Sequence, residues 1–517
     1  MTNAGEGAPA SAGPDAAYVE ARIALLRAGG QVLLKDAQLS VAAGELVLLV
    51  GGSGTGKSVL LRVMADLVDP TGGIVVTGEV RRRGRLGVVF QHGALFEQLT
   101  LADNLAFAAD HATPRGTVAQ RAALLAEVRI SPAIRLDGAS GGQRRRIAIA
   151  RALAAAPEIL LYDEPTAGLD PDLARHVAAL IRQMHDARGM ATLVITHDFP
   201  ALAPVADRIV FLDAKTQSLT LVTAQDLARM VDAGAFRASM DEAELAPSAR
   251  SLPRARPLLA ALGRAGGRVG AALVSSLLPR WRRPAWGARA FGHFLGLVAG
   301  PTSLAYVGLA GAVTGCVAVY FSFRYLPYAH ILGPLVTEDL LAALGFALFR
   351  VLVPILATTL VAARCGAALA SDLAGRSYRE ELAAMRVLGA HPGGLLGFSA
   401  IFAITLATPV LVLASFAVAR AVGLATYGLW DPAASAAWIE VIFHGVLRRG
   451  GGVVFAGTWW VVAKSAVCGL VVGAVAVGLS LSPKRHPDEV SHAVTRTVLV
   501  ATALVLVVHA AFAFIEF

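Results

Sequence analysis

The chain has 517 residues, of which 56% are hydrophobic and only 16% are charged, and its mean hydropathy is +0.61. This composition excludes both a disordered chain and an ordinary soluble globular protein. Most acidic residues lie in roughly the first 240 positions, whereas residues 340–515 are mostly apolar. We therefore predict a soluble domain followed by a membrane domain.

The net charge of +9 matches one basic stretch of the sequence. Nine arginines and no acidic residue lie from Arg250 to Arg289, and apolar runs alternate with them. This pattern favours an interfacial helix on an anionic membrane surface over about residues 258–290. A solvated basic linker is the alternative. Nucleic-acid binding is the weakest interpretation, because the stretch leads directly into a membrane span.

The soluble part alternates apolar strands with helical stretches. Residues 1–17 are rich in Gly, Ala, Pro and Ser, which predicts a disordered N-terminus, and they lack the apolar core of a secretory signal. Strands are predicted at residues 19–26, 45–50, 87–90, 159–163 and 192–196. The alternation predicts an α/β domain with a mostly parallel sheet over residues 18–239, followed by a linker at 240–257.

Five apolar segments follow, at residues 304–323, 340–361, 395–419, 453–481 and 497–515. Each is long enough to cross a hydrocarbon core of about 30 Å as a helix. With the basic stretch they form a predicted all-α membrane domain over residues 258–517. Basic residues between spans two and three follow the positive-inside rule, whereas Arg420, Arg448 and Arg449 in the second outer loop oppose it.

The strongest local motif is GGSGTGKS, which comprises Gly51, Gly52, Ser53, Gly54, Thr55, Gly56, Lys57 and Ser58. It matches the pattern G-x-x-x-x-G-K-[ST] directly after a predicted strand and before a helical stretch. Glycines let backbone N–H groups converge on phosphate oxygens, and the helix N-terminus adds a positive dipole end. We expect Lys57 to reach the β- and γ-phosphates and the Ser58 hydroxyl to bind Mg²⁺.

Two adjacent acids, Asp163 and Glu164, end another apolar strand. Asp163 is well placed to hold Mg²⁺ through water, and Glu164 can activate the attacking water as a general base. The alternative interpretation is that two acids simply close a strand. A further motif, Ala139-Ser140-Gly141-Gly142-Gln143, favours the nucleotide interpretation.

With this motif the sequence resembles the ATP-binding cassette (ABC) ATPases, whose signature reads LSGGQ. The likeness covers about residues 18–215. It includes Gln91, Asp170 and His197, which lie like the family's Q-loop, D-loop and switch histidine. The motifs occur in the family's order, so an α/β P-loop ATPase that binds ATP and Mg²⁺ is implied.

The resemblance also implies roles for these residues. The signature residues Ser140, Gly141, Gly142 and Gln143, with Asp170, would belong to the ATP site, and the first three would contact the γ-phosphate held by a partner's glycine loop. Gln91 would bind Mg²⁺ and link the attacking water to movements at the membrane contact. His197 would hold the γ-phosphate. Because each chain has one signature and one glycine loop, a closed C₂ homodimer is implied.

Two departures from the family pattern concern packing and adenine recognition. Ala139 replaces the usual leucine, a packing change that we expect to be tolerated. The family's adenine-stacking aromatic would fall near residues 27–30, where this sequence has none, and Tyr18 is too early. Arg27 could stack instead through its planar guanidinium.

The membrane half contains FRVLVPILATTLVAARCGAALASDLAGRSYREELAAMRVLGAHP at residues 349–392 and AKSAVCGLVVGAVAVGLSL around Lys464. These stretches resemble the MlaE-type permeases of lipid-asymmetry (Mla) and Mce-associated transporters. In the soluble half, GALF after Gln91 and GKSVLLR are typical of the partner ATPase, MlaF. Because the two are usually separate chains, this sequence resembles a fusion of them.

The combined resemblance implies ATP-driven transport of phospholipid between the bacterial inner membrane and a periplasmic MCE-domain carrier similar to MlaD. The ATPase domain would lie in the cytoplasm, and a STAS-domain protein could regulate it. One alternative is an exporter of hydrophobic drugs or sterol-like compounds. A second alternative is a membrane-anchored ATPase scaffold without transport.

Charged residues in the membrane half are candidates for coupling and for a substrate path. In ABC transporters a short cytoplasmic helix docks near the Q-loop, so the resemblance assigns coupling to Glu380, Glu381, Leu382 and Met385, against the alternative of a solvated loop. Arg350 and Lys464 lie inside predicted spans and Asp372 flanks one. Such residues are functional candidates, and these could contact lipid phosphate, pair with one another or extend to an interface.

Overall fold

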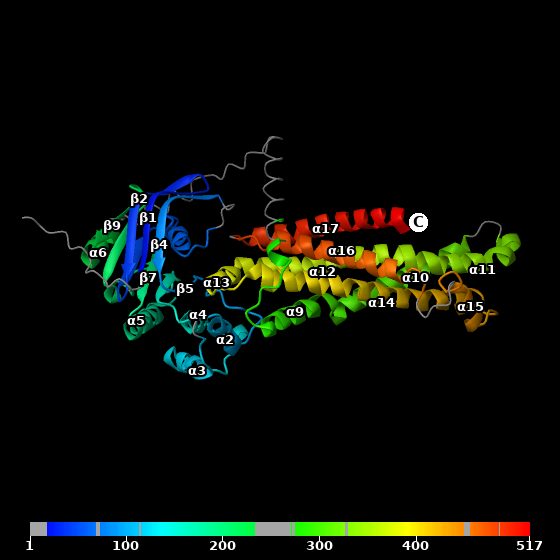
Figure 1. Cartoon of the computed structure of the whole chain (residues 1–517), viewed down its shortest axis with the longest axis horizontal. Coiled ribbons are helices and arrows are strands. Elements are labelled where there is room, and N and C mark those ends of the chain that lie inside the picture. Colours follow the sequence, from blue (N-terminus) through cyan, green and yellow to red (C-terminus); the bar gives the residue numbers. More distant parts are fainter. Residues whose placement is uncertain are drawn as a thin grey trace, which may run out of the picture. The chain divides into compact units, whose positions relative to one another are not determined.

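The computed structural model describes residues 18–68, 73–112, 115–232, 270, 274–325, 329–448, 455–484 and 486–516. The chain divides into two compact units (Figure 1). Unit 1 comprises Met1–Ala260 and Arg379–Ala390, and unit 2 comprises Ala261–Tyr378 and His391–Phe517. The first is α/β and the second is helical, which confirms the predicted fold class. The predicted disordered segment 1–17 and linker 240–257 lie outside the described residues.

Unit 1 is built on a six-stranded sheet of order β5-β6-β7-β3-β8-β9. Its strands are β3 (Leu46–Gly51), β5 (Leu86–Val89), β6 (Ile159–Asp163), β7 (Ala191–Thr196), β8 (Arg208–Asp213) and β9 (Ser218–Val222). All neighbours pair in parallel except β8 and β9. β3, β6 and β7 are buried along their whole length, as continuous apolar runs require in a sheet covered on both faces.

A second sheet in unit 1 is antiparallel, with the order β2-β1-β4. It consists of β1 (Tyr18–Ala28), β2 (Gln31–Ala42) and β4 (Ile74–Arg83). The strand predicted at residues 19–26 lies within β1. Tyr18 and Arg27 are therefore at opposite ends of one strand, and Arg27 is exposed.

Unit 1 also contains helices. They are α1 (Lys57–Met64), α2 (Leu101–His111), α3 (Val118–Glu127), α4 (Gly141–Ala154), α5 (Pro171–Arg188), α6 (Ala224–Asp232) and α13 (Glu381–Val387), with short turns η1 (Leu136–Gly138) and η2 (Ala203–Val205). Side chains of Thr100, Thr117, Ser140 and Asp170 accept backbone hydrogen bonds at the starts of α2, α3, α4 and α5. Such caps satisfy N–H groups that have no partner inside the helix.

Unit 2 consists of long helices. They are α9 (Pro284–Ala299), α10 (Pro301–Arg324), α11 (Ala329–Ala347), α12 (Val353–Tyr378), α14 (Phe398–Trp430), α15 (Ala436–Phe443), α16 (Thr458–Ser480) and α17 (Pro487–Glu516). Two π-helices, η3 (Leu348–Leu352) and η4 (Gly393–Gly397), lie directly before α12 and α14. Of the basic stretch predicted at 258–290, residue 270 and residues 274–290 are described, and α9 begins inside it.

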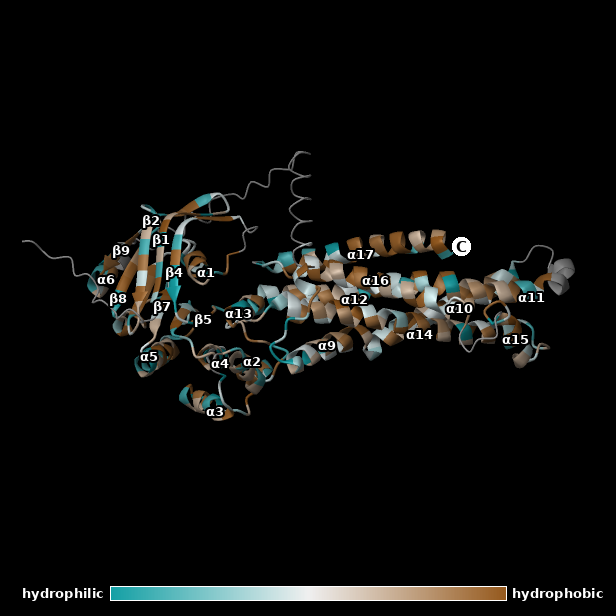
Figure 2. Ribbon diagram, in the orientation of Figure 1, coloured by the Kyte–Doolittle hydropathy of each residue, from teal (hydrophilic) through white to brown (hydrophobic). Residues whose placement is uncertain are grey.

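Five helical segments in the described part of unit 2 are long and apolar enough to cross a membrane: Pro284–Arg324, Val336–Tyr378, Gly393–Trp430, Thr458–Ser480 and Pro487–Glu516. Figure 2 shows the apolar residues along these helices. Each predicted span overlaps one of the five segments. Four of the segments are longer than predicted, because polar residues continue the helix beyond the apolar run, as in the last turns of α12.

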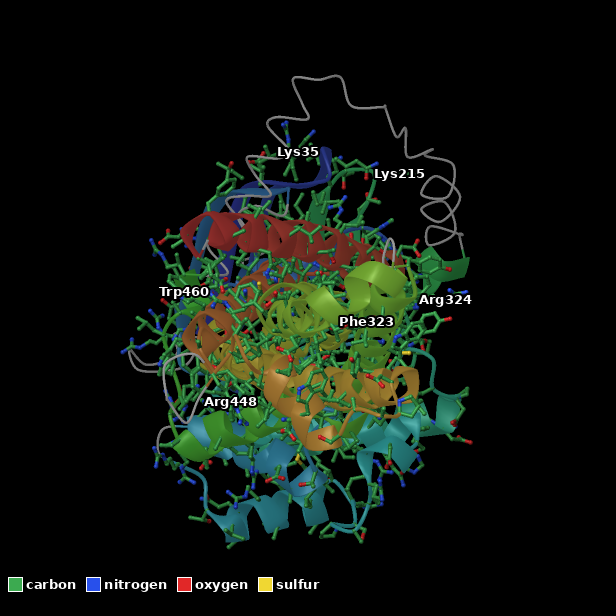
Figure 3. The ribbon with its side chains drawn as sticks, turned by 90° about the vertical axis from the view of Figure 1, so that its right-hand side faces the viewer. Lys35, Lys215, Phe323, Arg324, Arg448 and Trp460 are labelled. Carbon is green, nitrogen blue, oxygen red and sulfur yellow. The ribbon has the colours of Figure 1, made fainter. Side chains whose placement is uncertain are left out.

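Small residues allow α10 and α14 to pack closely. A Cβ atom added at Gly311 would lie less than 3.0 Å from Ser415, and one added at Gly315 would lie equally close to Ala419, a backbone contact in both cases. Phe323, labelled in Figure 3, lies further along α10. Its ring and that of Tyr427 in α14 meet edge to face at 4.9 Å. Small residues serve this purpose in membrane helix pairs, where close packing replaces the hydrophobic effect.

We expect Gly315→Ala to destabilise unit 2. The new methyl group would force α10 away from the backbone of α14, and overpacking of this kind costs about 1–3 kcal/mol. The measurement is the melting temperature of the purified protein in detergent. Gly296→Ala in α9 is the matched control, because a Cβ there meets nothing within 4 Å. Equal melting temperatures for the two variants would contradict the packing account.

Candidate functional site

Three neighbouring parallel strands end at the same edge of the main sheet of unit 1. β3 pairs with β7, and β7 pairs with β6, all in parallel. The carboxyl ends of such strands meet, so the segments that follow them lie together. These segments carry the glycine loop after β3, Glu164 after β6 and His197 after β7. The structure thus brings together the glycine loop, Glu164 and His197, which belong to separate motifs in the sequence.

The glycine loop connects β3 to α1 without any other secondary structure between them. Gly54 and Gly56 have positive φ angles of 78° and 100°, a conformation that favours glycine. The buried Lys57 donates from Nζ to the carbonyl oxygens of Gly51 at 2.9 Å and Gly52 at 2.7 Å. Burial lowers the pKa of the Lys57 ammonium, whereas the charges of Glu164 and Asp163 act in the opposite direction. The ammonium is therefore held inside the loop, close to two carboxylates.

Ser58 and Asp163 form the contact on which the predicted magnesium site depends. The Ser58 hydroxyl donates to Oδ1 of Asp163 at 2.9 Å. Burial raises the pKa of Asp163 to about 6. A bound proton or cation therefore stabilises this carboxylate. Mg²⁺ prefers oxygen ligands and keeps several waters, with one or two carboxylates from the protein. The hydroxyl and carboxylate present fit that ion, while Gln91 lies exposed in the turn after β5.

Glu164 is fixed by the residues that follow β7. Its Oε2 accepts from the Thr196 hydroxyl at 3.0 Å and from the backbone N–H of His197 at 3.2 Å. Its Oε1 lies 2.8 Å from Nδ1 of His197. The Glu164 side chain is 8% exposed and the His197 side chain 48% exposed. The histidine thus reaches solvent while it contacts a buried carboxylate, an arrangement that suits a general base and a phosphate contact.

The signature lies at the start of α4. Ser140 caps α4 together with Gln143: Gln143 N–H donates to the Ser140 hydroxyl at 3.3 Å, and Ser140 N–H donates to Gln143 Oε1 at 2.9 Å. The helix α4 packs against α2, α3 and β5. Gly142 lies against Leu173 near the cap of α5, where Asp170 accepts from Leu173 N–H at 2.9 Å. Ser140 and Gly141 are exposed.

Two arginines that the sequence analysis missed support these segments. Arg145 of α4 donates to the carbonyl oxygens of Pro165 at 2.5 Å and Ala167 at 2.7 Å, just after Glu164. Arg151 is 2% exposed and donates to Ala94 and Gly93, three residues or fewer after Gln91. Burial lowers the pKa of Arg151 to about 10. Arg145 and Arg151 belong to an arginine-rich helix, and the sequence of that helix does not indicate which distant backbone groups they contact.

The predicted coupling residues form helix α13, which belongs to unit 1 and packs against β5. Glu381, Leu382 and Met385 are buried. Glu380 precedes the helix and accepts from Arg62 Nη2 at 2.5 Å. Arg62 lies one turn after Ser58 in α1, so an ion pair joins the helix of the glycine loop to this segment. The predicted residues are thus packed into unit 1 rather than forming a solvated loop, and Arg62 was missed.

The three predicted path residues lie in two separate clusters of unit 2. Arg350 and Lys464 both contact Glu516. Asp372 instead accepts from Arg376 Nε at 2.7 Å and lies 3.3 Å from His293 Nε2. Arg350 and Asp372 are 22 residues apart on one helical segment, which corresponds to roughly 33 Å. The structure does not bring Asp372 together with the other two.

Comparisons with known proteins agree with this geometry. Residues 34–167 match the family described as "ABC transporter", and residues 297–515 match "Permease MlaE". A phosphonates import ATP-binding protein (PhnC 1) of Rhodopseudomonas palustris is 42% identical over 208 residues, which are 36% of this chain and 74% of that protein. The chain belongs to the ABC transporter family. It is an ATP hydrolase and a multi-pass membrane protein, with the permease fused behind the ATPase.

Further relatives match the same half of this ABC transporter. The sulfate/thiosulfate import ATP-binding protein CysA of Thermosynechococcus vestitus is 40% identical over 196 residues, which are 35% of this chain and 56% of that protein. A solved dimeric ATP-binding cassette in a post-hydrolysis state with ADP and Pi is 26% identical to this chain, with a TM-score of 0.34. The match covers 40% of this chain and 98% of the cassette's chain.

We expect the stability of the metal-free, nucleotide-free transporter to fall, relative to Asp163→Asn, as the pH rises. The folded protein keeps the Asp163 proton up to about pH 6, whereas the unfolded chain releases it near 3.8. The folded state thus binds more protons between these values, so its stability decreases with rising pH. The full loss is on the order of 3 kcal/mol.

The measurement is the melting temperature of unit 1 in the full chain with a chelator, from about pH 4 to about pH 7. Wild type should lose stability relative to Asp163→Asn across this range. The difference between the two proteins isolates Asp163, because the contributions of the other titrating groups cancel. Parallel curves for the two proteins would mean that Asp163 titrates normally.

We also expect Arg62 and Glu380 to be energetically coupled in ATP hydrolysis. Arg62→Gln and Glu380→Gln should each lower the ATPase rate, because each leaves a partly buried charge unpaired near Asp163. The double variant should recover part of the loss, with a coupling of about 0.5–3 kcal/mol between the two changes. Asp172 and Arg175 provide an exposed control pair. Additive losses for Arg62 and Glu380 would refute the coupling.

Proposed function

We propose that this chain is a half-transporter that uses ATP to move phospholipid between the inner membrane and a periplasmic MCE-domain carrier. The observation that carries the proposal is the match to Permease MlaE at residues 297–515 in the same chain as the glycine-loop and signature motifs of a cassette. The residues assigned to hydrolysis are Glu164, His197 and Gln91, with Lys57 and Ser58 on the phosphates and Mg²⁺. The relatives named for import match the ATPase half alone.

The energetics of lipid transfer support a continuous apolar route. Exposing two sixteen-carbon tails to water would cost roughly 25 kcal/mol at about 0.8 kcal/mol for each CH₂ group. A nucleotide cycle can hardly supply this amount, so the lipid must stay in an apolar environment. Closure of the ATPase units would then reshape a hydrophobic cavity between two permeases, from which the carrier takes the lipid.

The positions of the motifs support a homodimer. Cassettes of this family function as dimers. Here the exposed signature residue Ser140 caps α4. That helix packs against α2, α3 and β5. A second copy related by C₂ symmetry would place each signature on the other copy's loop. Such a dimer has two ATP sites and twice the five candidate spans. Ser140, Gly141, Gly142, Gln143 and Asp170 would then complete the partner's site.

The fold of α13 supports a direct link between hydrolysis and the permease. Glu381, Leu382 and Met385 are buried in unit 1, although the chain on both sides of α13 belongs to unit 2. Glu380 contacts Arg62 on the helix that starts at the glycine loop. Movement of that helix on hydrolysis would therefore pull on the chain between two spans. The proposal puts the ATPase on the cytoplasmic side, where a STAS-domain regulator could also bind.

The test is a lipid-transfer assay with Glu164→Gln. Removing the general base should lower ATP hydrolysis by about 10²–10⁴-fold. We expect transfer of labelled phospholipid from proteoliposomes to a soluble acceptor carrier to fall with it. Asp172→Asn is the control, because that carboxylate is exposed and paired only with Arg175 in the same helix among its described contacts.

Three outcomes would contradict the proposal. Phospholipid transfer that persists in Glu164→Gln would mean that hydrolysis does not drive it. No transfer by the wild type would favour an ATPase scaffold. Transfer of a hydrophobic drug or sterol-like compound without any transfer of phospholipid would favour an exporter of those compounds.

A further inference from the structure

Three charged side chains meet in the membrane-spanning part of unit 2. Glu516 at the end of α17 accepts from Arg350 Nε through Oε1 and from Lys464 Nζ through Oε2, the latter at 2.9 Å. The exposed fractions of these side chains are 1% for Glu516, 4% for Lys464 and 13% for Arg350. A single carboxylate thus bridges two cations, one with each oxygen. We call Arg350, Lys464 and Glu516 the bridging cluster.

The local fold is shaped around the two cations. Arg350 lies in the π-helix η3, and its carbonyl oxygen accepts from Lys464 Nζ. π-Helical turns inside helices often occur at functional sites. Gly457 precedes α16, and a Cβ added there would lie less than 3.0 Å from the Arg350 guanidinium. Glycine at this position therefore leaves room for the cation.

Each oxygen of the Glu516 carboxylate contacts one cation of the bridging cluster, where water is largely excluded. Burying charge is unfavourable unless it is paired and hydrogen-bonded. A phosphate diester resembles the Glu516 carboxylate in two respects: it carries one negative charge, and it offers two equivalent oxygens. The contacts that Glu516 makes are therefore contacts that a phosphate diester could also make.

Glu516 is carried by a helix whose apolar part is little buried inside the unit. Within the described residues, the apolar window of α17 is 17% buried inside the unit, compared with 61% for α16, which carries Lys464. α17 packs against α12 and α16. Its Phe512 ring lies 6.3 Å, centroid to centroid, from the ring of Trp460 in α16, and Figure 3 labels Trp460.

We propose that Glu516 is an internal counter-ion that competes with the phosphate diester of the cargo for Arg350 and Lys464. When no phosphate is bound, Glu516 closes the anion site. Binding of the diester displaces the carboxylate and releases the end of α17. This inference rests on the proposed function, and it adds a positioning role for Glu516 and a reason why a phosphate-bearing lipid would be preferred over a neutral one.

The test compares a phosphatidylglycerol with a fluorescent acyl chain to the matching diacylglycerol, which lacks the phosphate. Equilibrium binding is measured on the purified full-length chain in detergent. Glu516→Gln should bind the phosphatidylglycerol about tenfold more tightly than wild type, because a charge-assisted competitor is removed, and should bind the diacylglycerol unchanged. Arg350→Gln and Lys464→Gln should lower phosphatidylglycerol binding to the diacylglycerol level.

Asp488→Asn is the matched control, because it removes one acid from the exposed start of the same helix. If Glu516→Gln does not fold, Glu516→Asp replaces it, since a shorter carboxylate keeps the charge but weakens the bridge. It should shift phosphatidylglycerol binding in the same direction by a smaller factor. Inorganic phosphate is added separately to distinguish a lipid head group from free phosphate.

Phosphatidylglycerol binding that is unchanged or weaker in Glu516→Gln, or an equal gain in Asp488→Asn, would overturn the inference. Displacement of the labelled lipid from wild type by micromolar inorganic phosphate would assign the site to free phosphate instead. Lipid transfer by the wild type in the same preparation separates the two claims. Transfer with no effect of Glu516 refutes this inference alone, whereas absence of phospholipid transfer refutes the proposed function.

Discussion

Lys57, Asp163 and Glu164 place an ammonium and two carboxylates in a buried region where three parallel strands end. Charges in such a place are stable only when each is paired or hydrogen-bonded. Ser58 satisfies Asp163, and Thr196 and His197 satisfy Glu164. The order of the parallel strands is therefore the constraint on which the site depends. It also explains why the glycine loop and the two acids, far apart in sequence, lie together.

The same principle extends from the nucleotide site to the permease. Glu380 is paired with Arg62, one turn after Ser58, and in the membrane half Glu516 is shared by Arg350 and Lys464. Each pair joins segments that would otherwise be independent. If ATP binding shifts α1 and cargo binding releases α17, both events change the partner of a buried charge. Exchange of ion-pair partners is one way in which a protein can pass between two arrangements.

The sequence predicted the parts of the site that rest on local patterns. The glycine loop, the strand that ends at Asp163 and the cap formed by Ser140 and Gln143 each lie within a few residues of chain, so their chemistry could be inferred directly. Pairs between distant residues could not be inferred. Arg62 and Glu380 are 318 positions apart, and Arg350 and Glu516 are 166 positions apart. Nothing in the composition of either segment specifies such a partner. Asp372 shows both cases, because Arg376 lies one turn away in α12, whereas His293 comes from α9, 79 positions earlier.

The central claim is that cleavage of ATP in unit 1 drives movement of phospholipid through unit 2. The most direct measurement is the number of labelled phospholipid molecules delivered to the acceptor carrier for each ATP hydrolysed, in proteoliposomes at several ATP concentrations. The account predicts a constant ratio, because hydrolysis and transfer belong to one cycle. A ratio that falls toward zero as hydrolysis speeds up, with transfer unchanged, would contradict it.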